Sequence, residues 1–92
     1  MIVLKISIDE INTNNKIIDI RDKNSFNKLN YPGSINIPRL VLLSNPSDYI
    51  SKYETVYLIC DYGKASLLTA DILNKLGYNC YSIEGGIKKV LN

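Results

Sequence analysis

Residues 55–77 read TVYLICDYGKASLLTADILNKLG, and this stretch decides the fold because it combines a strand, a loop and a helix. The run TVYLI is rich in β-branched and aromatic residues, which favours a buried strand that ends just before Cys60. The polar run DYGKAS then predicts a tight loop, and Gly63 within it permits a positive φ. The apolar spacing that follows predicts an amphipathic helix with Ser66 as its N-cap. A strand, a loop and a helix in this order are typical of α/β proteins.

Cys60 is the candidate nucleophile of this stretch. Open α/β sheets bind ligands beyond the carboxyl ends of their strands, and Cys60 follows such an end. The loop amides and the positive end of the helix would surround its sulfur and stabilise a thiolate. The alternative is that Cys60 is a small buried residue, as most free cysteines are. The chain contains no histidine, which excludes Cys-His pairs and Ser-His-Asp triads within one subunit.

The rest of the chain alternates short apolar runs with segments of helical character, so we expect an α/β domain. Its sheet should be mainly parallel, with helices on both faces. The expected strands cover residues 1–8, 16–20, 34–37, 55–59 and 79–83, and the expected helices cover residues 23–29, 39–43, 46–53, 66–76 and 87–91. The helical residues expected to face the core are Phe26, Leu29, Tyr49, Ile50, Tyr53, Leu68, Thr69, Ile72, Leu73 and Leu76.

Length and composition predict one small globular domain spanning residues 1–92, because 46% of the residues are hydrophobic and 22% are charged. The net charge of +2 is small and no basic run is present, so nucleic acids and membranes are not expected as partners. The first residues, MIVLKISIDEI, fit neither a signal peptide nor a spanning helix, which favours a cytoplasmic location. The two cysteines are then expected to remain reduced.

Four parts of the chain resemble, in order, the motifs of rhodanese-like sulfurtransferases. CDYGKAS at residues 60–66 is similar to the active-site loop of that family, usually C-x-x-G-x-R followed by Ser or Thr. IIDIRD at residues 17–22 resembles its strand with the pattern Asp-x-Arg, and PGSINIP at residues 32–38 resembles its P-G-A-x-N-I-P segment. LGY at residues 76–78 and EGG at residues 84–86 together resemble its closing segment. Chance does not readily produce these motifs in one order.

The resemblance implies a three-layer sandwich with five strands and a sulfurtransferase activity in two steps. Cys60 would take a sulfur atom from thiosulfate, a polysulfide or a protein persulfide, and would pass it to cyanide or a thiol. The resemblance implies no metal and no organic cofactor. The residues implied to bind the donor are Asp61, Tyr62, Gly63, Lys64, Ala65 and Ser66, and the residues expected to support the loop rather than to react are Asp19 and Arg21.

The chain departs from the family pattern at several positions. Ala65 replaces the usual loop arginine, Asn30 and Tyr31 stand where a histidine is common, and Ile87 replaces a frequent tryptophan. Alanine lacks the forked donors of a guanidinium, so we expect weak use of thiosulfate. A binding module with an inactive or weakly active Cys60 remains an alternative. A phosphatase or arsenate reductase of related fold is disfavoured, because the end of the loop lacks an arginine to hold an oxyanion.

Two further side chains have open interpretations. Lys64 is the one cation of the loop and is expected to bind anionic donors, although such a lysine can also point into water. Cys80 lies in the last expected strand, where it is either a packing residue or a resolving thiol for Cys60. The packing role is favoured, because strand cysteines usually behave as small hydrophobic residues.

Overall fold

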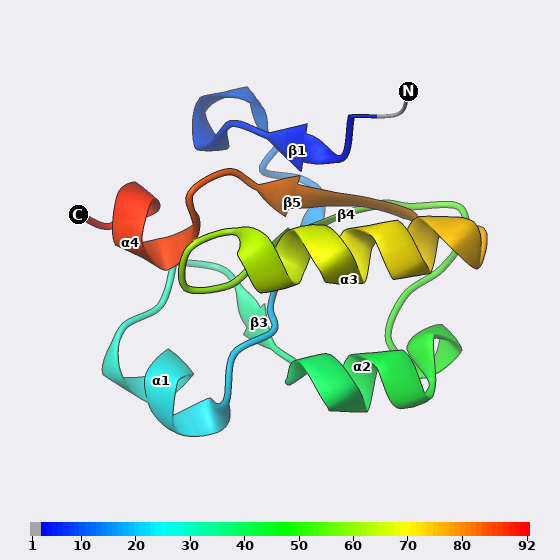
Figure 1. Ribbon diagram of the computed structural model, residues 1–92, viewed down its shortest axis with the longest axis horizontal. Coiled ribbons are helices and arrows are strands. Elements are labelled where there is room, and N and C mark those ends of the chain that lie inside the picture. Colours follow the sequence, from blue (N-terminus) through cyan, green and yellow to red (C-terminus); the bar gives the residue numbers. More distant parts are fainter. Residues whose placement is uncertain (1–2) are drawn as a thin grey trace.

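The structure, a computed structural model, describes residues 3–92. Its strands form one central sheet with helices around it (Figure 1). The strands are β1 (Lys5–Ile6), β2 (Lys16–Asp19), β3 (Ile35–Asn36), β4 (Thr55–Ile59) and β5 (Asn79–Ile83). The α-helices are α1 (Lys23–Lys28), α2 (Arg39–Ser44), α3 (Lys64–Lys75) and α4 (Gly86–Val90), and the short 3-10 turns are η1 (Ile8–Glu10) and η2 (Pro46–Asp48).

Neighbouring strands of the sheet all run parallel, in the order β1-β5-β4-β2-β3. The register sets Asp19 of β2 beside Ile59 of β4, so these two strands end at the same level. Because parallel strands have their carboxyl ends on one edge, the loops after β2, β4 and β5 gather there. Figure 1 shows the loop before α3 at the same end of the sheet as α1 and α4. The predicted α/β class with a five-stranded parallel sheet is confirmed.

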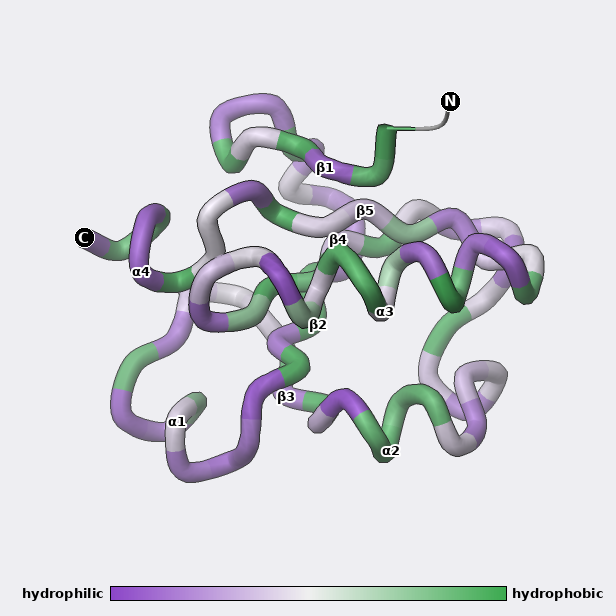
Figure 2. Tube along the Cα trace, viewed as in Figure 1, coloured by the Kyte–Doolittle hydropathy of each residue, from purple (hydrophilic) through white to green (hydrophobic). Residues whose placement is uncertain are grey.

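Side chains alternate between the two faces of the sheet and form two apolar clusters. Ile18 and Leu58 belong to the cluster that contains Leu73 of α3, whereas their chain neighbours Ile17 and Tyr57 belong to the other. The covering helices complete the clusters with Leu42, Ala70 and Leu73 on one face and Ile87 on the other. Figure 2 shows hydrophobic residues in the central strands and in these helices. The predicted helices on both faces are therefore present.

The prediction that Leu68, Ile72 and Leu76 of α3 face the core is wrong. These residues are 58%, 38% and 51% exposed, respectively. Small side chains on the opposite side of α3 allow the helix to approach β4 and β5 closely, and the larger aliphatic residues are left outside. The buried residues of α3 are Ser66, Thr69, Ala70 and Leu73.

The helix predicted from Pro46 onward is only the short turn η2. The backbone N–H groups of Tyr49 and Ile50 both donate to the carbonyl oxygen of Pro46, at 2.9 Å each. The helical hydrogen bonding therefore ends after this single turn. Ile50 is buried as predicted, but Tyr49 and Tyr53 are exposed. The prediction that the two tyrosines of this segment are buried is therefore wrong.

Two further boundaries differ from the prediction. Leu29 has extended backbone angles and ends α1 at Lys28, so Leu29 is exposed while Phe26 is half-buried. The strand predicted over residues 1–8 is reduced to Lys5–Ile6, and residues 1–2 lie outside the described part of the chain. Within residues 3–92, no helix has the length and apolar character needed to cross a lipid bilayer.

Candidate active site

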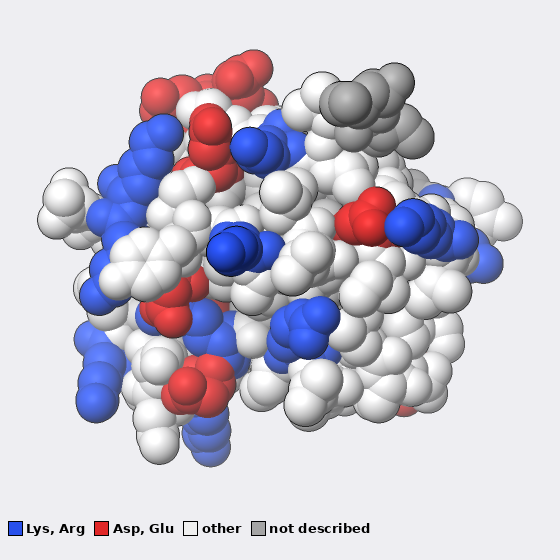
Figure 3. Space-filling view, in the orientation of Figure 1, with Lys and Arg blue, Asp and Glu red and all other residues white. Residues whose placement is uncertain are grey.

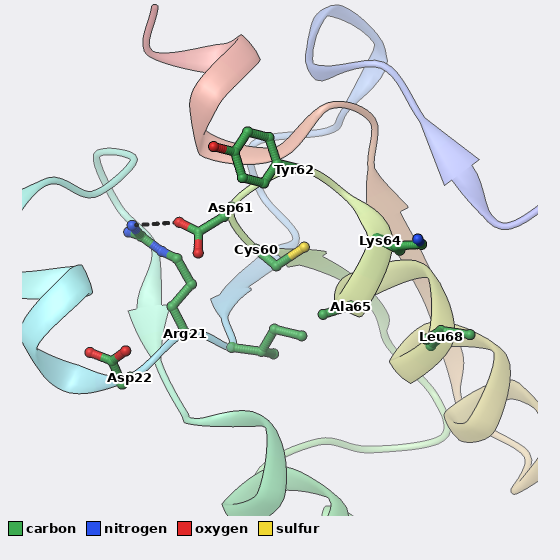
Figure 4. A pocket seen from close by; sticks show the side chains of 9 residues that line it. Arg21, Asp22, Cys60, Asp61, Tyr62, Lys64, Ala65 and Leu68 are labelled. Carbon is green, nitrogen blue, oxygen red and sulfur yellow. Dashed lines mark ion pairs between the residues drawn. The ribbon is translucent and has the colours of Figure 1, made fainter.

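A pocket of about 440 Å³ opens beside Cys60 at the carboxyl end of the sheet (Figure 4). Cys60 directly follows β4 and is buried, with 5% of the residue exposed. Figure 4 shows its sulfur directed toward the N-terminus of α3. The lining residues come from the end of β2, the loop after β4 and the first turns of α3, and they are Ile20, Arg21, Asp22, Cys60, Asp61, Tyr62, Lys64, Ala65 and Leu68.

The Cys60 sulfur lies in a concavity lined by N–H groups, as the sequence predicted. It accepts hydrogen bonds from the backbone N–H groups of Gly63 and Ser66, both at 3.2 Å. Gly63 has a φ of 96°, a left-handed conformation that helps to turn these amides toward one point. The N–H groups and the adjoining helix N-terminus favour an anionic sulfur over a neutral one. The site can therefore hold a thiolate or a persulfide anion.

The role predicted for Ser66 as the N-cap of α3 is wrong. Gly63 is the N-cap, and the helix begins at Lys64. Because the left-handed Gly63 turns the chain early, Ser66 lies in the first helical turn with its side chain buried. A first-turn N–H has no partner within the helix, and that of Ser66 donates to the Cys60 sulfur instead.

Asp19 and Arg21 form a buried ion pair beside the loop. Arg21 donates from Nε to Asp19 Oδ1 at 3.0 Å and from Nη2 to Oδ2 at 2.7 Å, which is a forked geometry. This hydrogen bonding to Asp19 raises the pKa of Arg21 above its usual value. Arg21 Nη1 also lies 3.6 Å from Asp61 Oδ1, which links the loop to the end of β2 (Figure 4). The structure therefore brings both predicted supporting residues to the site.

The other side chains of the loop form the rim of the pocket. Asp61, Tyr62, Lys64 and Ala65 are all exposed and all line it. Figure 4 shows the Lys64 side chain directed away from Cys60, whereas Ala65 lies close to the sulfur in the same view. Ala65 therefore presents only a methyl group to the pocket, and the Lys64 side chain points away from the sulfur.

The N-terminal residues of α4 hold the backbone of the loop in place, a role that we did not predict. The backbone N–H groups of Ile87 and Lys88 donate to the carbonyl oxygens of Cys60 and Asp61, at 2.8 and 3.0 Å. Gly86 has a φ of 64°, and a Cβ atom there would overlap both carbonyl oxygens. These bonds fix the peptide planes of the loop and so the direction of its N–H groups. The available signal was the glycine pair Gly85-Gly86, which follows the predicted strand after a single residue.

Ser82 of β5 is a second residue of the site that we did not predict. Its hydroxyl oxygen lies 2.6 Å from that of Ser66, and both residues are buried. Strand alternation had placed Ser82 on the same face as Cys80, so a polar residue on a buried face was the available signal.

Cys80 lies apart from the site and has a different chemical character. It is fully buried in β5 and pairs in register with Val56, four residues before Cys60 and so roughly 13 Å away along the strand. Burial raises the pKa of the Cys80 thiol to about 12, and the charge of Glu54 adds to the shift. A thiol that stays protonated is a poor nucleophile, so the packing role is favoured over the resolving role.

The charges around the pocket are mixed. Figure 3 shows Lys, Arg, Asp and Glu side chains interspersed on the face in view. Arg21 and Lys64 line the pocket together with Asp22 and Asp61. Residues 3–92 contain no group of three or more His, Cys, Asp or Glu side chains that could hold a metal ion. Recognition of a ligand at this pocket therefore depends on individual side chains and on the backbone.

Comparison with known proteins places this site in a family. Residues 5–92 match the Rhodanese-like domain family. The chain is 33% identical over 73 residues to the thiosulfate sulfurtransferase GlpE of Tolumonas auensis, which covers 78% of this chain and 68% of that protein. It is 29% identical over 86 residues to the adenylyltransferase and sulfurtransferase uba4 of Ogataea parapolymorpha, which covers 90% of this chain. The chain spans only about a fifth of the length of such relatives, 22% in this case.

A solved structure supports the same assignment. SSP1007 from Staphylococcus saprophyticus has a TM-score of 0.82 to this chain at 26% sequence identity, and the match covers 92% of this chain and 90% of that one. The fold, the buried Cys60 and the matched family therefore agree. The chain belongs to the family of rhodanese-like domains and is homologous to sulfurtransferases.

Proposed function

We propose that residues 1–92 act as one sulfurtransferase domain that carries a sulfur atom on Cys60 as a persulfide. The observation that carries this proposal is the Cys60 sulfur itself, which accepts two backbone N–H groups beside an open pocket. Donors that are in place before the reaction stabilise an anionic sulfur without reorganisation. The similarity to proteins named as sulfurtransferases supports the same activity.

The reaction has two steps that leave the protein unchanged overall. In the first step the Cys60 thiolate attacks the outer sulfur of a donor such as thiosulfate. A new sulfur–sulfur bond forms, the bond within thiosulfate breaks, and sulfite leaves with the electron pair. In the second step a thiolate or cyanide attacks the outer sulfur of the Cys60 persulfide, and the Cys60 thiolate is released. Neither step requires a metal or an organic cofactor.

The pocket favours donors that lack the sulfonate oxygens of thiosulfate. Ala65 offers only its backbone, and the Lys64 side chain points away from the sulfur (Figure 4). The Arg21 guanidinium is already engaged with Asp19 and lies beside Asp61. Exposed Tyr62 and Leu68 add apolar surface to the rim. We therefore place polysulfides and protein persulfides ahead of thiosulfate as donors.

The acceptor in this proposal is a thiol, with cyanide as the substitute used in assays. A reducing cytoplasm suits such chemistry, because it keeps Cys60 and Cys80 as free thiols between turnovers.

The test is to incubate the purified protein with thiosulfate or with polysulfide and to measure its intact mass. We expect the mass of one added sulfur atom, mapped by peptide analysis to Cys60, and more of it from polysulfide than from thiosulfate. The Cys60→Ser variant should gain no sulfur, and the matched Cys80→Ala variant should gain as much as the unaltered protein. Absence of the added sulfur with every donor would favour the alternative of a binding module.

A further inference from the structure

A pair of buried hydroxyl groups lies behind the Cys60 sulfur. Ser66 of α3 and Ser82 of β5 are 0% and 1% exposed, and their Oγ atoms are 2.6 Å apart. Ser66 contacts the sulfur directly, because its Oγ lies 3.2 Å from Cys60 Sγ. Ser82 has no such bond to the sulfur and reaches it only through Ser66. A strand residue in the core is therefore connected to the reacting atom.

In the thiol form, one continuous chain of hydrogen bonds satisfies all of these groups. The Cys60 thiol donates to Ser66 Oγ at 3.2 Å. The Ser66 hydroxyl can then donate to Ser82 Oγ at 2.6 Å, and the Ser82 hydroxyl donates to the carbonyl oxygen of Gly63 at 3.3 Å. Each hydroxyl donates one bond and accepts one, which is the full use of its single proton.

The thiolate form requires the same chain to run in the opposite direction. When the thiol proton has passed to solvent water, Cys60 Sγ can only accept, so the Ser66 hydroxyl turns to donate to it. The Ser82 hydroxyl then donates to Ser66 Oγ across the same 2.6 Å. The Gly63 carbonyl loses the Ser82 hydroxyl but keeps the backbone N–H of Leu67 at 3.2 Å. The reversal therefore leaves no buried polar group without a partner.

We propose that Ser82 is a positioning residue that directs the Ser66 hydroxyl toward the Cys60 thiolate. The proposal rests on the proposed role of Cys60 as a nucleophile. By donating to Ser66 Oγ, Ser82 polarises the Ser66 hydroxyl and makes it a third donor to the anionic sulfur, beside the N–H groups of Gly63 and Ser66. Without Ser82, the Ser66 hydroxyl has the Gly63 carbonyl at 3.3 Å as a competing acceptor.

The test measures how fast iodoacetamide alkylates Cys60 as a function of pH, in the full chain and without any sulfur donor. For Ser82→Ala we expect the rate near pH 7 to fall roughly three- to tenfold, and the pH of half-maximal alkylation to rise by about half a unit to one unit. Cys80 does not interfere, because its thiol stays protonated over this range. An unchanged profile in a folded Ser82→Ala variant would overturn the proposal.

A double-mutant cycle separates this positioning role from a role in stability alone. If Ser82 acts through Ser66, then Ser82→Ala should change the alkylation rate by less than about twofold when Ser66 is already alanine. An equal effect of Ser82→Ala in both backgrounds would mean that it acts on the fold and not on the Ser66 hydroxyl. Circular dichroism establishes that each variant is folded.

A matched pair of variants keeps the test valid if alanine weakens the fold. Ser82→Thr keeps the hydroxyl and Ser82→Val removes it, while the two side chains have nearly the same shape. We expect the threonine variant to retain the original pH profile and the valine variant to show the shift; identical profiles would overturn the proposal. Since alkylation requires no sulfur donor, a failure of sulfur transfer with a normal alkylation profile would refute the proposed function and not the role of Ser82.

Discussion

Replacing Ala65 by arginine should make this protein a better thiosulfate enzyme. Ala65 lies in the first turn of α3, is exposed, and lines the pocket together with Cys60. A guanidinium at this position could place two parallel N–H donors on the oxygens of the sulfonate group. The helix should tolerate the change, because arginine is a good helix former and the Ala65 carbonyl keeps its bond from the Thr69 hydroxyl at 2.7 Å.

The size of the effect follows from the strength of one charged hydrogen-bonding contact. Such a contact contributes about 1.5–3 kcal/mol, which corresponds to roughly ten- to a hundredfold in binding. Residue 65 is exposed, so water and salt weaken the contact, and we expect a gain in binding near the lower, roughly tenfold end of this range. We expect kcat/KM for thiosulfate to rise about tenfold at low ionic strength, mainly through a lower KM, and the gain to shrink as salt is added.

The assay is formation of thiocyanate from thiosulfate and cyanide, run in parallel with polysulfide as the donor. Ala65→Lys adds a charge without the forked donors, and Ala65→Met adds length without a charge, so the gain should be largest for arginine and absent for methionine. Turnover of polysulfide should be nearly unchanged in all three variants. No gain with arginine would show that the sulfonate does not approach residue 65, and an equal gain with both donors would show an effect on Cys60 rather than on donor binding.

Three other predictions concern the frame around the site. Arg21→Ala should lower the free energy of unfolding by about 3–5 kcal/mol in urea denaturation, since it leaves the buried Asp19 carboxylate unpaired; a loss below about 1 kcal/mol would contradict this. Gly86→Ala should disrupt the loop and abolish persulfide formation, whereas Gly33→Ala, at a positive φ with open space around it, should only reduce stability; persulfide formation by the Gly86 variant would count against the role of the N-terminal residues of α4. Because the pKa of Cys80 is raised from 9.0 to about 12 in the folded protein, the unfolded chain loses this proton first, so stability should fall between pH 9 and about 12. Cys80→Ala should remove that part of the decline, and an unaltered pH dependence would contradict the assignment.

The parts of the fold and site that depend on local sequence were predictable. The apolar run before Cys60, the glycine in the loop and the helical spacing after it lie within one stretch, and the structure places β4, the loop and α3 there in that order. The apolar run and its flanking charges also predicted that Asp19 and Arg21 lie at the end of a buried strand, and the resemblance to the family placed them beside the loop.

The predictions for α3 that were wrong depend on how this helix packs against the sheet, and local sequence does not determine that packing. Leu68, Ile72 and Leu76 have the spacing of a core stripe, but the side of α3 that packs on the sheet is the one with small residues such as Ala70. Hydrophobic periodicity reports the polarity of side chains, but it does not report how closely a helix can approach the sheet. The start of α3 was misplaced for a related reason, since Ser66 is a good N-cap in isolation and is buried here only because Gly63 begins the helix earlier.

The loop separates the backbone groups that hold the sulfur from the side chains that form the pocket rim, and under the proposed function this separation explains how the usual loop arginine can be absent. The Cys60 sulfur is held by backbone N–H groups whose directions depend on Gly63 and on the N-terminal residues of α4. Neither depends on the side chain at residue 65. The pocket rim consists of side chains, so under the proposed function the choice of donor can change while the nucleophile stays intact. Under the proposed function, Ala65 indicates a different donor rather than an inactive site, and alkylation of Cys60 should show the same dependence on pH whether residue 65 is alanine or methionine, even if the longer side chain slows access of the reagent.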